Sequence, residues 1–346
     1  MARRGWVRSI PLATLVAAAA GAAQLGIGYG LGIVAWTPPG GDGPTATGAW
    51  TASLAWASWI AATSVVMGAV VAERGASVGN GRLARLAVRL TIVFAAALGA
   101  LVVIPLVGVP ASRANIADNY APHLLAGIYA GIGVILGLLM AVAAVYARAV
   151  GANVIASAGF LWALAIAALA SGVGWPGYGQ LGVWKFTEGP IWQSYHIPGA
   201  LLTLAAALLI GGLAAFPAAS RGAGAFGVMV SGAAGPLLLM AAYILADPVS
   251  GLVPDEQLSA YATAPVAVVV GVVGSFLAAI VGRPPSSRRR RRKNPPSEPA
   301  ADVAEEPAPE QAGYYSARPL PPPSATAVTG KASVPASSRV DPVSLH

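Results

Sequence analysis

Residues 122–147 read PHLLAGIYAGIGVILGLLMAVAAVYA, and this stretch decides the fold class. It contains no Asp, Glu, Lys or Arg, and its apolar residues run continuously instead of alternating. About 20 such residues allow a helix to cross a hydrocarbon layer of ~30 Å. Lipid cannot bond to backbone groups, so a spanning segment must be a helix or part of a closed barrel. The continuous pattern favours a helix.

Seven further stretches share this character, which predicts an all-α, polytopic transmembrane helix bundle. The chain is 56% hydrophobic and only 10% charged, whereas a soluble domain is about 25% charged. The eight expected spans, all within a membrane domain at residues 1–282, are 11–36, 50–72, 90–108, 122–147, 152–173, 198–217, 224–246 and 262–282.

The first span has an alternative interpretation as a signal peptide. Arg3 and Arg4 precede an apolar core, and a run of small residues lies near Ala22. The apolar stretch continues to Trp36, which is too long for a cleaved signal and favours a retained span.

The basic residues predict the orientation of the bundle. With the N-terminus inside, 19 of the 21 Lys and Arg residues lie on that side, and only Arg113 and Lys185 lie on the other. This split follows the positive-inside rule and predicts cytoplasmic N- and C-termini in a cell (plasma) membrane. The excess of Arg (18) over Lys (3), with abundant Ala and Gly, is typical of a bacterial source.

Prolines and tryptophans support the same orientation. Three prolines are expected to open helices that start outside, namely Pro122, Pro198 and Pro265. Five tryptophans are expected to form a belt at the outer boundary of the membrane: Trp36, Trp50, Trp175, Trp184 and Trp192.

Residues 283–346 form a different kind of segment. They contain 13 of the 28 prolines and little apolar material, which predicts a disordered cytoplasmic tail. The tail begins with a basic run that is expected to contact anionic lipid headgroups, or to act only as a stop-transfer signal; its residues are Arg288, Arg289, Arg290, Arg291, Arg292 and Lys293. Because nearly all cations flank spans, the net charge of +8 does not indicate a nucleic-acid partner.

The spans themselves contain no Asp, Glu, Lys or Arg, which argues against proton-driven transport. The first and fourth spans carry glycines four residues apart, as in Gly26-Gly30 and Gly133-Gly137. Such pairs let helices approach closely. These glycine pairs favour packing between helices of the same chain. The alternative is that a partner membrane protein binds at one of these GxxxG faces or at the tail.

Several groups inside the spans are expected to face protein. Proline removes a backbone donor, so Gly235-Pro236 predicts a kink in the seventh span. Interrupted helices often line binding sites, but a purely structural kink is the simpler interpretation. Gln24 and Tyr243 are expected to hydrogen-bond within the protein. Trp56 and Trp59 are expected to pack between helices or, alternatively, to stack on a lipid chain.

The loop 174–198 is the best candidate for recognition. It is the longest outer loop, and it mixes aromatic rings with hydrogen-bonding groups, as interfaces do. The alternative is a loop anchored on the lipid headgroups by its rings. The candidate residues are Trp175, Tyr178, Trp184, Phe186, Trp192, Tyr195 and His196.

The sequence carries no pattern that points to catalysis. GxSxG, HExxH and P-loop motifs are absent, and the lack of cysteine excludes disulfides and thiolate ligands. We therefore expect no enzyme activity, no cofactor and no metal. The expected function is assembly or anchoring in the lipid bilayer. The alternative is a transporter or channel for a small or lipidic solute.

Overall fold

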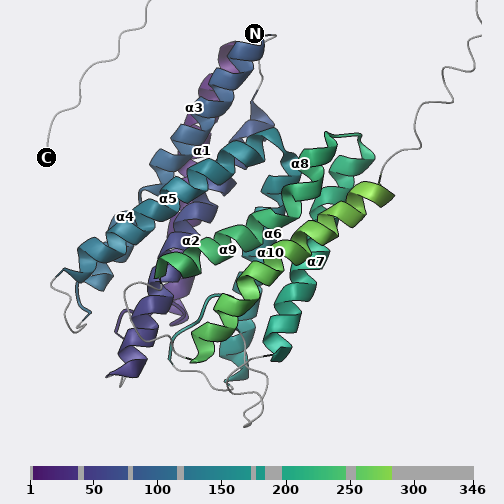
Figure 1. The fold of residues 1–346 in the computed structure, drawn as a ribbon. Coiled ribbons are helices and arrows are strands. Elements are labelled where there is room, and N and C mark those ends of the chain that lie inside the picture. Colours follow the sequence, from purple (N-terminus) through teal and green to yellow (C-terminus); the bar gives the residue numbers. More distant parts are fainter. Residues whose placement is uncertain are drawn as a thin grey trace, which may run out of the picture. The chain divides into compact units, whose positions relative to one another are not determined.

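The computed structural model describes residues 3–37, 43–76, 81–114, 121–172, 177–183, 197–246 and 255–282. Every regular element in these ranges is helical (Figure 1). The elements are α1 (Arg3–Gly30), α2 (Pro44–Gly75), α3 (Arg82–Ala100), α4 (Val103–Ala111), α5 (Pro122–Tyr146), α6 (Arg148–Ser171), α7 (Ile197–Ser220), α8 (Ala225–Val230), the 3-10 turn η1 (Ser231–Ala233), α9 (Ala234–Ala246) and α10 (Asp255–Val281).

Eight helices in the described ranges are long and apolar enough to cross a membrane, with α3–α4 and α8–η1–α9 each counting as one. The predicted all-α class and the number of long apolar helices are therefore confirmed. The predicted tail, including its basic run, lies outside the described residues.

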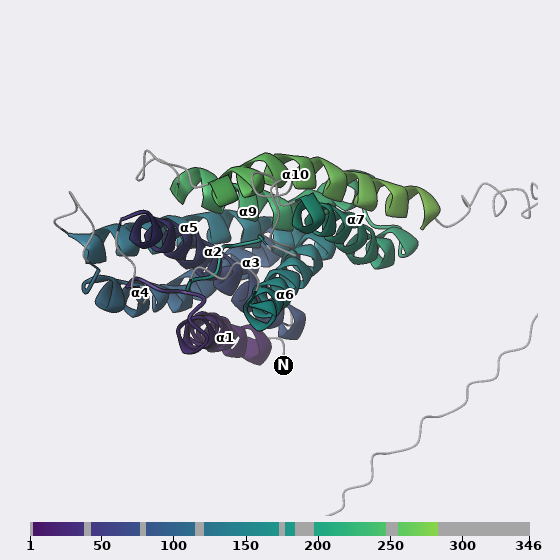
Figure 2. The ribbon, with the colours of Figure 1, turned by 90° about the horizontal axis from the view of Figure 1, so that it is seen from below.

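Helix α2 occupies the core of the bundle. Its most apolar window is 89% buried, against 28% for α1 and 33% for α6. Helices α1, α3, α5, α6 and α9 all contact it, and Figure 2 shows it enclosed by neighbours. The small serine and threonine residues of α2 can be buried because their hydroxyl groups form hydrogen bonds with nearby backbone oxygens. Ser58, for example, donates to the backbone oxygens of Leu54 and of Tyr129 in α5, both at 3.1 Å.

Glycines bring α5 directly onto α2. A methyl group at Gly133 would collide with the backbone of Ser58, and one at Gly137 would collide with the next turn of α2. This pair is therefore committed to packing within the chain. Gly26 and Gly30 of α1 differ, because a methyl group at either position would meet no atom within 4 Å.

Helix α1 ends at Gly30, earlier than the expected boundary of the first span. Gly32 adopts a positive φ of 67°, and the backbone N–H groups of Ile33 and Val34 both donate to the oxygen of Gly28, at 2.8 and 3.0 Å. Glycine adopts this left-handed conformation without strain and so terminates the helix. Apolarity alone did not reveal this stop, because Leu31–Trp36 is as apolar as the helix.

The rings of Trp36 and Trp50 do not face outward, as rings of the expected belt would. Their side chains are 5% and 1% exposed, and their rings meet edge to face with centroids 5.1 Å apart. The indole N–H of Trp36 donates to the hydroxyl of Tyr29 at 3.1 Å. Burying two large rings against each other removes more apolar surface from solvent than facing a headgroup region would.

Prolines shape two further helices. Pro105, in the first turn of α4, has no N–H to offer the carbonyl of Leu101, and the chain turns at Leu101 and Val102 between α3 and α4. The expectation that Pro265 opens a helix is wrong, since α10 begins at Asp255 and carries Pro265 inside it. Proline inside such a helix is tolerated where neighbouring groups satisfy the freed carbonyl.

The junction of α5 and α6 consists of one non-helical residue. Ala147 has φ −124° and ψ 97°, between Tyr146 at the end of α5 and Arg148 at the start of α6. This corner fixes the direction in which α6 leaves α5.

Candidate functional site

Residues 177–183, part of the aromatic loop, are built into the bundle. The N–H of Gly179 donates to the oxygen of Ile33 at 2.9 Å. The indole N–H of Trp56, in α2, donates to the oxygen of Gly179, also at 2.9 Å. The hydroxyl of Tyr243, in α9, donates to the oxygen of Leu181. This segment therefore takes part in hydrogen bonds with groups far apart in the sequence.

The local sequence allows this burial because it is uncharged and ends in glycine turns. Gly177 and Gly182 have φ of 85° and 74°, a region that glycine adopts freely. Between them, Tyr178 and Leu181 are 4% and 1% exposed. Gly48 of α2 gives the Tyr178 ring room to approach, since a methyl group there would collide with the phenol.

Of the candidate recognition residues, only Tyr178 falls within the described residues, and it packs against Ala49 and Ala52 of α2. The others lie outside the described residues: Trp175, Trp184, Phe186, Trp192, Tyr195 and His196.

Gln24 of α1 is hydrogen-bonded to both α2 and α6. Its side-chain oxygen accepts from the indole N–H of Trp162 at 2.9 Å and from the hydroxyl of Thr63 at 3.4 Å. Its amide nitrogen donates to Ser64 at 3.3 Å. The expectation that Gln24 bonds within the protein is confirmed. The Trp162 ring also packs on Trp56, with centroids 4.8 Å apart.

A second polar centre surrounds the interruption of the seventh apolar helix. The helix changes to the 3-10 turn η1 at Ser231–Ala233, directly before Gly235-Pro236. Because proline has no N–H, it cannot satisfy the carbonyl one turn earlier. Gly232 then lies against the backbone of Gly271 in α10, where no larger residue would fit.

Asn153 of α6 stabilises the start of α9. Its side-chain oxygen accepts the N–H of Gly235 at 2.7 Å, a bond between groups that are both buried. Its amide nitrogen is also buried and has no hydrogen-bond partner among the described residues. An unpartnered buried donor is costly. Asn153 therefore has unused capacity to bind an acceptor.

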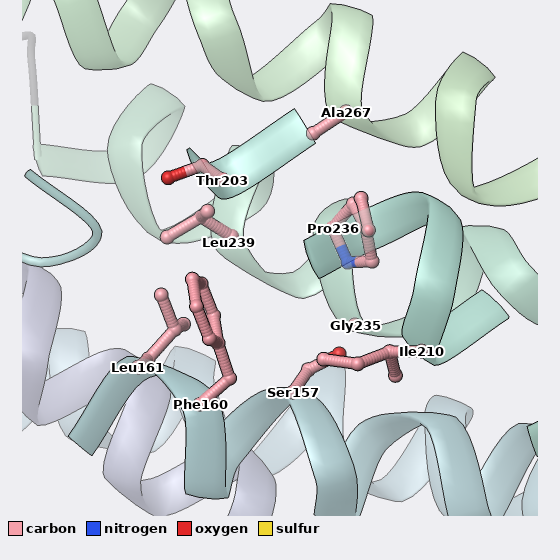
Figure 3. A pocket seen from close by; sticks show the side chains of 10 residues that line it. Ser157, Phe160, Leu161, Thr203, Ile210, Gly235, Pro236, Leu239 and Ala267 are labelled. Atoms are coloured by element: carbon pink, nitrogen blue, oxygen red, sulfur yellow. The ribbon is translucent and has the colours of Figure 1, made fainter. Parts of the chain in front are cut away.

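A small cavity adjoins this interruption (Figure 3). Its volume is about 20 Å³, enough for one water molecule. Ser157 and Thr203 supply hydroxyl groups to its wall, and Phe160, Pro236 and Leu239 supply apolar surface. None of the side chains that line it is ionisable. The arrangement can hydrogen-bond an uncharged group, but its own side chains offer no proton-transfer chemistry.

Sequence reasoning singles out neither Asn153 nor the burial of residues 177–183. The available signals are an amide within an apolar span, and a loop segment that is free of charge although Lys185 and Glu188 follow soon after. Either signal identifies a buried contact only when the hydrogen-bond partner on another helix is known.

Comparisons with known protein families, with curated proteins and with solved structures give no match to this chain.

Proposed function

We propose that this chain is a multi-pass protein of a bacterial plasma membrane, with both termini in the cytoplasm, that anchors or assembles other membrane components. The membrane position is supported by large apolar side chains on the outer surface of the helices, such as Leu15 (67% exposed), Leu213 (73%) and Val269 (62%). Extended apolar surface of this kind is stable in lipid and unfavourable in water.

The observation that carries the assembly role is the attachment of residues 177–183 to the bundle. Trp56 and Tyr243 hold backbone oxygens of this segment, and Gly179 bonds to Ile33. The segment is therefore a fixed base for the aromatic residues that flank it in the sequence, which themselves lie outside the described residues. A fixed base lowers the entropy lost when a partner binds. A loop that only rests on headgroups needs no such attachment.

Helix α1 offers a second contact face. Gly26, Ile27 and Gly30 are exposed, and the two glycines meet open space. Another membrane helix could approach this face as closely as α5 approaches α2.

The test is site-specific photo-cross-linking in the native membrane from positions 186 and 195 of the loop, which leaves Trp184 and Trp192 free to be varied. We expect a discrete protein adduct, whose yield falls in a Trp184→Ala, Trp192→Ala double variant because a hot spot of on the order of 2 kcal/mol is lost. The matched control is Phe216→Ala, which removes a half-exposed ring of α7 (47% exposed). Adducts to lipid alone, or equal losses in both variants, would contradict the assembly role.

A transporter or channel for a small solute is the second candidate, and the interrupted helix favours it. Discontinuous helices with freed backbone groups commonly bind solutes at mid-membrane depth, and Asn153 supplies an unused donor there. The size of the adjoining cavity favours the assembly role over transport, because a volume of about 20 Å³ admits only a water molecule. Solute-dependent thermal stabilisation that disappears in Asn153→Ala would instead support transport.

A further inference from the structure

A cavity of about 530 Å³ lies at the end of the bundle where α5 meets α6. Three arginines line it from separate segments: Arg89 of α3, Arg148 of α6 and Arg221 directly after α7. No acidic side chain is among its lining residues. The volume falls within the range of about 300–1,000 Å³ that is typical of small-ligand sites.

Arg89 is held in position by two contacts. Its guanidinium lies 3.3 Å from the carboxylate of Glu73 and 5.0 Å from the ring centroid of Tyr146, which also lines the cavity. Its Nε is buried and has no hydrogen-bond partner among the described residues. Such support places a charged donor at the cavity before any ligand arrives.

The charge of the other two arginines is not neutralised. Glu73 offsets Arg89, whereas Arg148 and Arg221 are exposed and form no ion pair with any residue in the described ranges. The cavity therefore carries an excess of positive charge. A bound anion would reduce the electrostatic repulsion between these arginines, so it would stabilise this end of the bundle.

The first turn of α6 adds to the positive potential. Ala147, Arg148 and Ala149 all line the cavity, and no side chain caps this helix. The first N–H groups of a helix have no partner within it and attract anions. Ala147, the one residue between α5 and α6, thus lies at the cavity together with the start of α6.

We propose that this cavity binds a phosphate group, carried by an anionic lipid headgroup or by a free phosphate compound. Arginine forks and helix N–H groups together match the several oxygens of phosphate better than a single carboxylate. Phe226, which lies between the lining residues Gly224 and Gly227 and is 80% exposed, supplies an apolar contact for acyl chains. Only the lipid source depends on the proposed membrane position; the phosphate chemistry does not. None of the residues that line the cavity belongs to the basic run of the tail.

The experiment measures binding to the purified full-length protein in neutral detergent, by native mass spectrometry and thermal stabilisation. The probes are short-chain phosphatidic acid, short-chain phosphatidylcholine and inorganic phosphate. The test variant is Arg148→Gln, Arg221→Gln. The matched control is Arg82→Gln, Arg85→Gln, which removes the same charge from exposed residues of α3 that do not line the cavity. Both variants keep the basic run of the tail.

We expect phosphatidic acid to bind more tightly than phosphatidylcholine. The test variant should bind it at least about tenfold more weakly, the effect of losing one charge-assisted hydrogen bond, while the control changes little. Inorganic phosphate that binds comparably identifies a free phosphate compound as the ligand, and lipid binding alone identifies the headgroup. Equal weakening in both variants, or no binding of either anion, overturns the proposal. If the double variant fails to fold, Arg221→Gln against Arg85→Gln gives the same comparison.

Discussion

Replacing Tyr243 by Phe should loosen residues 177–183 from the bundle. The change removes one oxygen atom from a side chain that is only 5% exposed. It leaves the backbone oxygen of Leu181 without the hydroxyl that donates to it. The ring remains and keeps its packing on Tyr261, with centroids 5.3 Å apart. Shape is therefore nearly conserved, and the effect isolates the hydrogen bond.

The magnitude follows from the surroundings of this bond. A buried acceptor left unsatisfied costs about 1–3 kcal/mol in a water-soluble protein. Between helices in a membrane the cost averages about 0.6 kcal/mol and reaches about 1.7, because the opened state finds other partners. The membrane range applies to the proposed membrane position. It corresponds to an opening equilibrium raised by about 3- to 18-fold.

Hydrogen exchange at the amide of Gly179 measures this opening. Its N–H donates to the oxygen of Ile33 at 2.9 Å, so it exchanges only when the segment separates from Ile33, in the turn that follows α1. The matched control is Tyr261→Phe, which removes a hydroxyl that donates to the backbone oxygen of Tyr243 at 2.6 Å. An unchanged exchange rate in Tyr243→Phe, or an equal rise in the control, would refute the attachment of the segment through Tyr243.

Three further outcomes are expected. Gly133→Val should abolish folding or lower thermal stability strongly, because α5 lies against the backbone of α2, whereas Gly26→Val should be tolerated; equal stability of the two variants in a melting assay would contradict this packing. A reporter fused after Lys293 should be active only if it works in the cytoplasm, and one inserted after Glu188 only if it works outside; the reverse result rejects the proposed orientation. Replacing Arg288–Arg292 by Gln should weaken binding of a tail peptide to anionic vesicles, by roughly 1 kcal/mol per charge near the surface, and salt-insensitive binding would argue against headgroup contact.

The number and type of the long helices could be predicted because they depend on one local property. A continuous apolar run such as residues 122–147 has few stable conformations in lipid, and helix is the available one. The end of α1 at Gly30 could not be predicted from apolarity, because it depends on the left-handed conformation of Gly32 and on backbone amides that donate to the oxygen of Gly28.

The candidate sites were harder to predict because they depend on pairs of residues from distant helices. Nothing near Trp50 in the sequence indicates that Trp36 covers its ring. Likewise Asn153 gains its role only when Gly235 lies beside it. Two glycine pairs with the same spacing also differ in use, since Gly133 is enclosed and Gly26 is not. Periodicity shows that a face is available but not what covers it.

The single residue between α5 and α6 also limits how the length of this chain can change. Each residue of a helix adds a rotation of about 100° and a rise of about 1.5 Å. A loop of several residues can accommodate an insertion by changing its conformation, but a one-residue connection such as Ala147 cannot. One added or deleted residue there would turn Asn153 away from Gly235 and Trp162 away from Gln24 at once. Homologues of this chain should therefore have no insertions or deletions between α5 and α6, even where the side chains there differ.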